Sequence, residues 1–159
     1  MGNKRNKNKR IPSSASKDVR QAKHPTHIED PDSFYNYFPS WRFMRCDCDH
    51  ERWRVASDVI TDELLNHLSS YESRKWSEIL QDASGRRRNT RNHLVYFEDM
   101  VREARQRAVQ LKLDSEDGLY SLALSGKKRL WGVMQSEGVF CIVWYDPGHE
   151  ICPSRKRYT

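Results

Sequence analysis

The sequence contains no apolar stretch long enough to cross a membrane. Its longest uninterrupted apolar run is Val139–Tyr145, whereas a membrane-spanning helix needs about 20 apolar residues. The first residues, MGNKRNKNKRIPSSAS, carry cations but lack the apolar core of a secretory signal, and Asn6 stands where a myristoylation signal needs Ser or Thr. These absences predict a soluble, cytoplasmic protein without a membrane partner.

Cysteine is also scarce, with 4 residues in a chain of 159. Because no export signal is present, free thiols are expected rather than disulfides. The segment CDCDH offers Cys46, Cys48 and His50, but a structural zinc site needs about four ligands, and Cys-x-Cys is not its usual spacing. Cys152 and His149 could complete a set, which leaves a zinc-stabilised adaptor as an open alternative. The favoured interpretation has no metal and no other cofactor.

The apolar share of the chain is 36%, low for a fully packed domain, while charged residues make up 31%. The polar excess is concentrated at the N-terminus, where large apolar side chains are nearly absent. We therefore predict a disordered basic tail over residues 1–33 and a single folded domain over residues 34–159. The net charge of +6 favours anionic partners such as nucleic acid.

The periodicity of apolar residues predicts helices before strands. Helical spacing occurs in three segments: 56–73, 75–82 and 97–113. Ser57 is expected to cap the first of them. The segment 41–55 suggests a strand, a turn and a second strand, and 83–93 suggests a loop.

The last third of the domain has the pattern of an antiparallel meander. Strands are expected in three segments: 119–124, 129–134 and 139–145. The third is apolar on both faces, so it should be covered on both sides, with Cys141 in the core. Trp131 and Trp144 are expected to pack in the core rather than to stack on bases. The order of elements predicts an α+β domain in which N-terminal helices pack on a small antiparallel sheet.

A basic constellation is expected at one end of that sheet. Three cations stand at the turn before the second strand: Lys127, Lys128 and Arg129. His149 follows the third strand, and in an antiparallel pair the start of one strand lies opposite the end of the next. RNA cleavage by the 2′-hydroxyl needs a base, a cation for the phosphate and an acid, which a His with Arg and Lys neighbours can supply. The alternative is that His149 only caps the strand end and Arg129 pairs with an acid such as Asp146.

Other cations could bind phosphate groups of nucleic acid: Arg86, Arg87, Arg88, Arg91 and Arg155. A solvated loop is the alternative for the arginines of segment 83–93.

The segment GLYSLALSGKKRLWGVMQSEGVFCIVWYDPGHEI resembles the C-terminal sheet of the RelE/ParE toxin superfamily. The similarity lies in a strand pair, with Tyr120 and Leu122 on the first strand and Arg129 followed by Leu-Trp-Gly on the second, and it extends over Tyr96–Ser154. The longer pattern is also similar to small uncharacterised bacterial and phage-borne proteins. The resemblance implies a RelE-like fold.

The resemblance also implies a site. In the ribosome-dependent mRNA endonucleases of this superfamily, a strand arginine and a basic or histidine residue after the last strand form the active site, which corresponds to Arg129 and His149 here. Ser121 and Ala123 stand where the family has strand lysines, so the two turn lysines would replace them. ParE-type members keep the fold, lack ribonuclease chemistry and inhibit gyrase.

We therefore expect a toxin-like, metal-independent endoribonuclease of a toxin–antitoxin system, acting on mRNA in association with the ribosome. Arg129 would stabilise the phosphate, His149 would act as acid or base, and Lys127 and Lys128 would neutralise the RNA backbone. The resemblance implies an acidic antitoxin as partner. The alternative is a non-catalytic module of the same fold that binds nucleic acid or protein.

Overall fold

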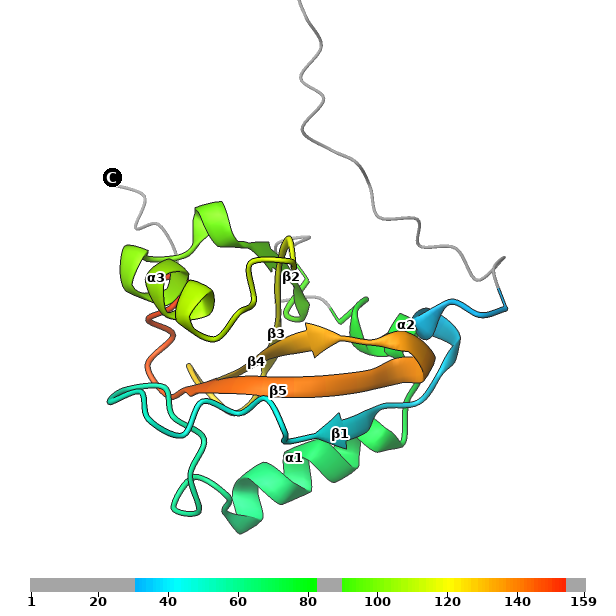
Figure 1. Cartoon of the computed structure of the whole chain (residues 1–159). Helices are drawn as coiled ribbons and strands as arrows, with labels where there is room; N and C mark the ends of the chain where they lie inside the picture. The colour runs from blue at the N-terminus through cyan, green and yellow to red at the C-terminus, as the bar shows by residue number, and fades with distance from the viewer. Residues whose placement is uncertain (1–30, 83–89, 154–159) are drawn as a thin grey trace, which may run out of the picture.

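The computed structural model describes residues 31–82 and 90–153 (Figure 1). Its helices and strands, in chain order, are β1 (Ser40–Arg42), α1 (Asp62–Glu72), α2 (Trp76–Ile79), β2 (His93–Tyr96), α3 (Arg102–Gln110), β3 (Gly118–Ala123), β4 (Arg129–Met134) and β5 (Val139–Asp146). Three short 3-10 turns complete them: η1 (Phe34–Asn36), η2 (Phe97–Asp99) and η3 (Ser136–Gly138). The α+β class is confirmed. Residues 1–30 of the expected tail lie outside the described residues.

The five strands form one sheet in the order β1-β5-β4-β3-β2. The pairs β2–β3, β3–β4 and β4–β5 are antiparallel, but β1 pairs with β5 in parallel. The prediction of an antiparallel sheet is therefore wrong at this edge, and the sheet is mixed. No hairpin joins β1 to β5, so no turn constrains their relative direction.

Helices cover both faces of the sheet, with α1 on one side and α3 on the other (Figure 1). On the α1 face, Leu64, Leu68 and α2 pack against Leu122 and Ile142. On the α3 face, alanines of the helix pack against the strands, together with Trp131 and Trp144. Strand β5 is buried on both faces and Cys141 is fully buried, as its apolar pattern predicts.

The segment after β1 does not form the expected second strand. It runs along β5 instead, where the Asp47 amide donates to Val143 O (2.9 Å) and the Tyr145 amide donates to Trp53 O (3.0 Å). The register between β4 and β5 shifts at this contact. Trp131 pairs with Trp144, but the next residue of β4, Gly132, pairs with Ile142. Val143 is thus the extra residue of a β-bulge, whose unpaired backbone groups are free to bond to the covering segment.

Two helices begin later than their patterns predict. Thr61, not Ser57, caps α1, and its Oγ1 accepts from the Leu64 amide at 3.3 Å. The chain is extended at Met100 and Val101, so α3 begins only at Arg102. The Val101 amide donates to Ile151 O (2.9 Å), and this tertiary bond competes with a longer helix.

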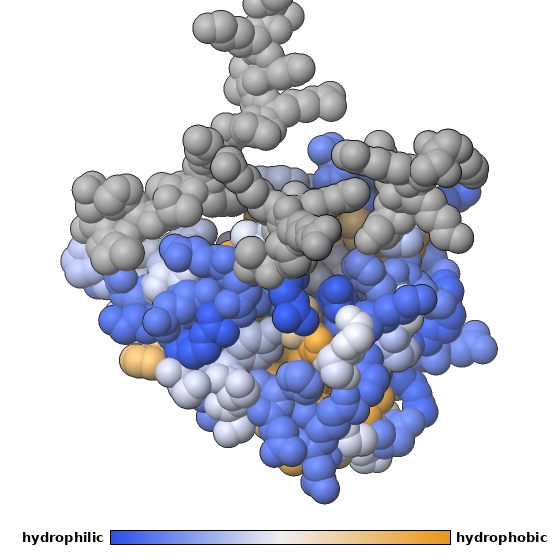
Figure 2. Space-filling model, turned by 180° about the vertical axis from the view of Figure 1, so that it is seen from behind, coloured by the Kyte–Doolittle hydropathy of each residue, from blue (hydrophilic) through white to orange (hydrophobic). Residues whose placement is uncertain are grey.

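The face seen in Figure 2 is mostly hydrophilic, with an apolar strip between polar side chains. Within residues 31–82 and 90–153, no helix combines the length and the apolar character needed to cross a membrane.

Candidate functional site

The end of the sheet where β4 begins and β5 ends holds most of the candidate residues. Arg129, the first residue of β4, pairs with Ala123 of β3 and with Asp146 of β5. His149 lies three positions beyond Asp146, in the turn that leaves the sheet. Arg129 and His149 therefore lie at the same end of the sheet, as the strand order predicts.

Asp146 holds the turn that carries His149. Its fully buried carboxylate accepts hydrogen bonds from the amides of Gly148 (3.2 Å), Glu150 (2.8 Å) and Ile151 (3.0 Å). His149 has a φ of 59°, the left-handed region that costs an ordinary residue about 1–2 kcal/mol. The bonds to Asp146 offset that cost, so the backbone position of His149 is determined by the buried carboxylate.

Arg129 bonds to the turn between β3 and β4. Its Nη1 donates to Lys128 O (2.8 Å) and to Gly126 O (3.1 Å). Burial, and then the charge of Arg91, lower the pKa of Arg129, but a guanidinium stays charged at neutral pH. The bonds to neutral carbonyls leave its positive charge at the end of the sheet.

His149 lies in a cationic environment. Burial is the largest cause that lowers the pKa of His149, and the charge of Arg129 is the next. His93 and Lys127 also lower this pKa, whereas the Asp146 carboxylate raises it. Because the ordinary pKa of His is about 6.5, a lowered pKa leaves the imidazole mainly neutral at pH 7. The neutral form of His149 can accept a proton, and the smaller imidazolium fraction can donate one.

His93 also lies at this end of the sheet, although the sequence pattern did not indicate it. It is the first residue of β2, on the same face of the sheet as Arg129, and its Nδ1 lies 3.1 Å from Thr90 O. Burial and Arg129 lower the pKa of His93, although the bond to Thr90 raises it. The alternation of HLVY, whose third residue Val95 is buried, is a weak strand signal that could have revealed its position.

The turn lysines do not act together. Lys128 Nζ lies 2.6 Å from Glu63 Oε2 of α1, on the face of the sheet opposite to Arg129. This ion pair with α1 holds Lys128 on that face. Lys127 is exposed and its charge acts on His149. The structure therefore separates Lys128 from the other candidates.

The remaining candidates divide into three groups. Arg91 is exposed beside the site, where its charge acts on Arg129. Both Trp131 and Trp144 are fully buried, so neither is a stacking platform for bases. The other predicted nucleic-acid contacts lie outside the described residues: Arg86, Arg87, Arg88 and Arg155.

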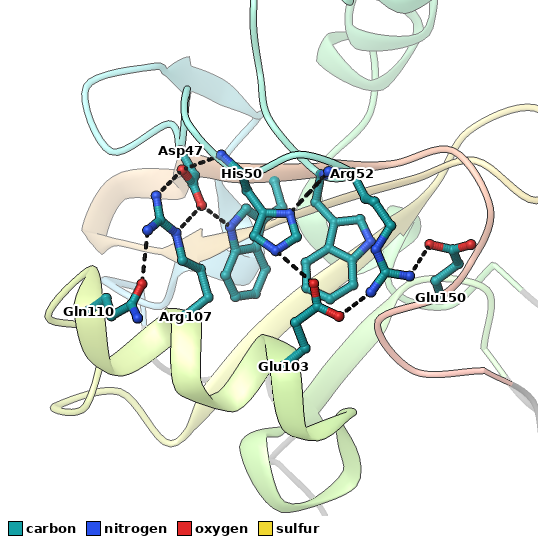
Figure 3. Close-up of polar contacts among 9 residues, drawn as sticks. Asp47, His50, Arg52, Glu103, Arg107, Gln110 and Glu150 are labelled. Carbon is teal, nitrogen blue, oxygen red and sulfur yellow. Dashed lines mark hydrogen bonds and ion pairs between the residues drawn. The ribbon is translucent and has the colours of Figure 1, made fainter.

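The motif CDCDH forms a polar anchor rather than a cluster of metal ligands. Burial raises the pKa of the Cys46 thiol to about 12, and Cys48 Sγ points to Val55 O at 3.4 Å. Among residues 31–82 and 90–153, no group of three or more His, Cys, Asp or Glu side chains is arranged to hold a metal ion. Asp47 and His50 of the motif instead bind residues of α3 (Figure 3).

Asp47 is the centre of the first contact with α3. Its buried carboxylate accepts two bonds from Arg107, from Nη2 (2.7 Å) and Nε (2.8 Å), and one from Trp144 Nε1 (2.9 Å) (Figure 3). Burial would raise the pKa of Asp47, but these hydrogen bonds outweigh it and lower the pKa to about 2. Asp47 therefore joins the segment after β1 to α3 through Arg107 and to the core through Trp144.

His50 makes the second contact. Its Nδ1 accepts from the amides of Arg52 (3.3 Å) and Trp53 (3.2 Å), so Nε2 carries the proton and faces Glu103 of α3 at 3.3 Å. Arg52 bridges Glu103 and Glu150, the residue after His149 (Figure 3). The anchor thus also reaches the turn of the candidate site.

Asn92 attaches β2 to the rest of the fold. Its buried side chain donates to Ile79 O (2.8 Å) and accepts from the Ala123 amide (2.7 Å) and from Tyr71 Oη (3.3 Å). These bonds place the neighbouring residue, His93, at the site end of the sheet.

Comparisons of the chain with protein families, with curated proteins and with solved structures give no match. The protein is thus defined by its own geometry, as an α+β protein with a cationic site containing two histidines. That site is the basis for a functional proposal.

Proposed function

We propose that this protein is a metal-independent endoribonuclease of the toxin type, which cleaves mRNA with the ribose 2′-hydroxyl as the nucleophile. The observation that carries the proposal is the meeting of Arg129 and Lys127 with His149 at one end of the sheet. Cleavage of this kind places extra negative charge on the phosphate and needs proton transfer. Arg129 would stabilise the charge, Lys127 would attract the RNA backbone and His149 would transfer a proton.

A RelE-like fold is part of the proposal. It is supported by the resemblance of the β3–β4 strand pair and by two helices that precede the antiparallel strands. From that resemblance we further propose action at the ribosome, a cytoplasmic location and an acidic antitoxin that covers the site. The net charge of +6 agrees with acidic and RNA partners.

The test is induced expression in bacteria of the intact protein and of two variants, His149→Ala and Arg129→Ala. The proposal expects growth arrest and cleaved transcripts with the intact protein, and rescue by either substitution. His67→Ala is a matched control, because His67 lies on α1 at the opposite face of the sheet. It should arrest growth like the intact protein.

The contrary outcome is equally clear. Normal growth and intact transcripts, from a protein shown to be folded, would contradict the nuclease proposal. The non-catalytic binding module would then be the better interpretation of the same surface.

A further inference from the structure

His93 has the position of a second proton-transferring group. It pairs with Ser121 of β3, while Arg129 pairs with Ala123, two residues further along the same strand. Residues that pair across strands share a face, and so do residues two apart, so both side chains lie on one face. On β3, the small side chains of Ser121 and Ala123 occupy the positions between them.

The backbone also selects the tautomer of His93. Its Nδ1 lies 3.1 Å from Thr90 O, and a carbonyl oxygen can only accept a hydrogen bond. Nδ1 therefore carries the proton in the neutral ring. The lone pair of Nε2 is left as the proton acceptor, which is the state that a general base requires.

His149 follows β5, on the side of Arg129 away from β2, in the turn held by Asp146. The charged groups that face the two imidazoles are Arg129 from β4, Lys127 from the preceding turn and Asp146 from the end of β5. Arg129 acts on both rings and His93 acts on His149. In the strand order β5-β4-β3-β2, Arg129 of β4 lies between His93 of β2 and the turn after β5 that carries His149. A phosphate group bound at Arg129 would therefore have one histidine on the side of attack and the other on the side of departure.

We propose that His93 and His149 form an acid–base pair that cleaves RNA, with His93 as the base and His149 as the acid. His93 Nε2 takes the proton of the 2′-hydroxyl, O2′ bonds to phosphorus, the bond from phosphorus to O5′ breaks, and the His149 imidazolium gives its proton to O5′. The products are a 2′,3′-cyclic phosphate and a 5′-hydroxyl, and solvent returns the two histidines to their starting states. The substrate class is RNA, because DNA lacks the 2′-hydroxyl. This inference rests on the proposed nuclease function.

The test uses the full-length protein and short mRNAs of defined sequence, with and without ribosomes. One mRNA is normal, and a second carries sulfur in place of O5′ at the cleaved bond. A thiolate leaves without receiving a proton, since thiol pKa values are near 8.5. The sulfur substrate therefore removes the need for the acid but not for the base.

The variants are His93→Asn and His149→Asn. Asn at position 93 can still donate to Thr90 O, and Asn tolerates the left-handed backbone at position 149. His67→Asn on α1 is the matched control, and urea unfolding checks that each variant is folded. Each site variant should cut normal mRNA at least about 100-fold more slowly. With the sulfur substrate, the cleavage rate of His149→Asn should come within a few-fold of that of the intact protein. The rate of His93→Asn should stay low.

A measurement on the intact protein does not depend on any variant. With normal mRNA the rate should rise with pH as the base loses its proton and fall at higher pH as the acid loses its proton. With the sulfur substrate the fall at higher pH should disappear. A fall that persists would contradict the role of His149 as acid.

Other outcomes would overturn the inference or its premise separately. If His93→Asn cuts as fast as the intact protein while His149→Asn is inactive, the nuclease stands and the histidine pair is wrong. If sulfur restores His93→Asn instead, the assigned roles are wrong. If the intact protein cuts neither substrate under any condition, the proposed function itself fails.

Discussion

Arg129 and Asp146 pair across β4 and β5, yet their side chains bond to backbone groups and not to each other. Asp146 accepts amide hydrogens of the turn that carries His149, and Arg129 donates to carbonyls of the turn that carries Lys127. Each charged residue thus braces one of the two turns at the site. Since no described residue forms an ion pair with Arg129, its charge can act on a bound phosphate.

The two turn lysines provide a matched pair of variants. Lys127→Ala should slow RNA cleavage by about fivefold or less, because an exposed charge contributes about 1 kcal/mol at most. The effect should weaken as salt rises, since salt screens exposed charges. Lys128→Ala should leave the rate unchanged, because Lys128 pairs with Glu63 on the other face. Rates at low and high salt check both variants, and a larger effect from Lys128→Ala would contradict this division of roles.

Asp146→Asn should lower the free energy of unfolding by about 2 kcal/mol. The amide group would turn an NH₂ toward backbone N–H donors that now bond to a carboxylate oxygen. Urea denaturation measures the change. Glu150→Gln is the control, since Glu150 forms an exposed pair with Arg52 and should change stability by less than about 1 kcal/mol. Equal effects of the two substitutions would argue against the role of Asp146 in holding the turn.

Thr61→Ala should cost about 1 kcal/mol of stability, whereas Ser57→Ala should cost almost nothing. Thr61 Oγ1 accepts from the Leu64 amide at the start of α1, and loss of such a cap typically has this cost. Ser57 is exposed and precedes the helix by several residues. Thermal or urea unfolding of the two variants, side by side, decides which residue is the cap.

Acid should weaken the contact between Asp47 and Arg107. The folded pKa of Asp47 is lowered to about 2 from an ordinary value of 3.8, so its carboxylate binds fewer protons in the folded state. A lowered pKa contributes stability above the unfolded value, and that stability is lost as pH falls from about 4 to about 2. Urea denaturation across this range should show the loss.

Asp47→Asn tests the same contact at neutral pH. The variant should lose about 3 kcal/mol, because it leaves a partly buried Arg107 without its charged partner. Its difference from the intact protein should shrink in acid, where Asp47 is itself protonated. Asp49→Asn is the control, since Asp49 is exposed and lies 4.0 Å from Arg107. A variant difference that stays constant from pH 7 to pH 2 would contradict the pKa argument.

The strands β3, β4 and β5 could be predicted because local patterns specify them. Each has a run of apolar residues bounded by a turn, and neighbours in sequence are also neighbours in the sheet. Strand β2 escaped prediction because it has only four residues and depends on the buried Asn92 to hold it against β3. Likewise β1 pairs with a strand at the far end of the sequence, which no local pattern indicates.

The candidate site also has a part that local sequence patterns specify and a part that they do not. Local pairing rules are enough to bring Arg129 and His149 to the same end of the sheet, because a hairpin places the start of one strand opposite the end of the next. The presence of His93 beside them and the absence of Lys128 depend on how the whole chain packs. His93 comes from a strand paired through non-local contacts, and Lys128 is drawn to the opposite face by Glu63 of a helix far earlier in the chain. Local periodicity carries no information about such partners, since they depend on how the helices and the sheet pack together.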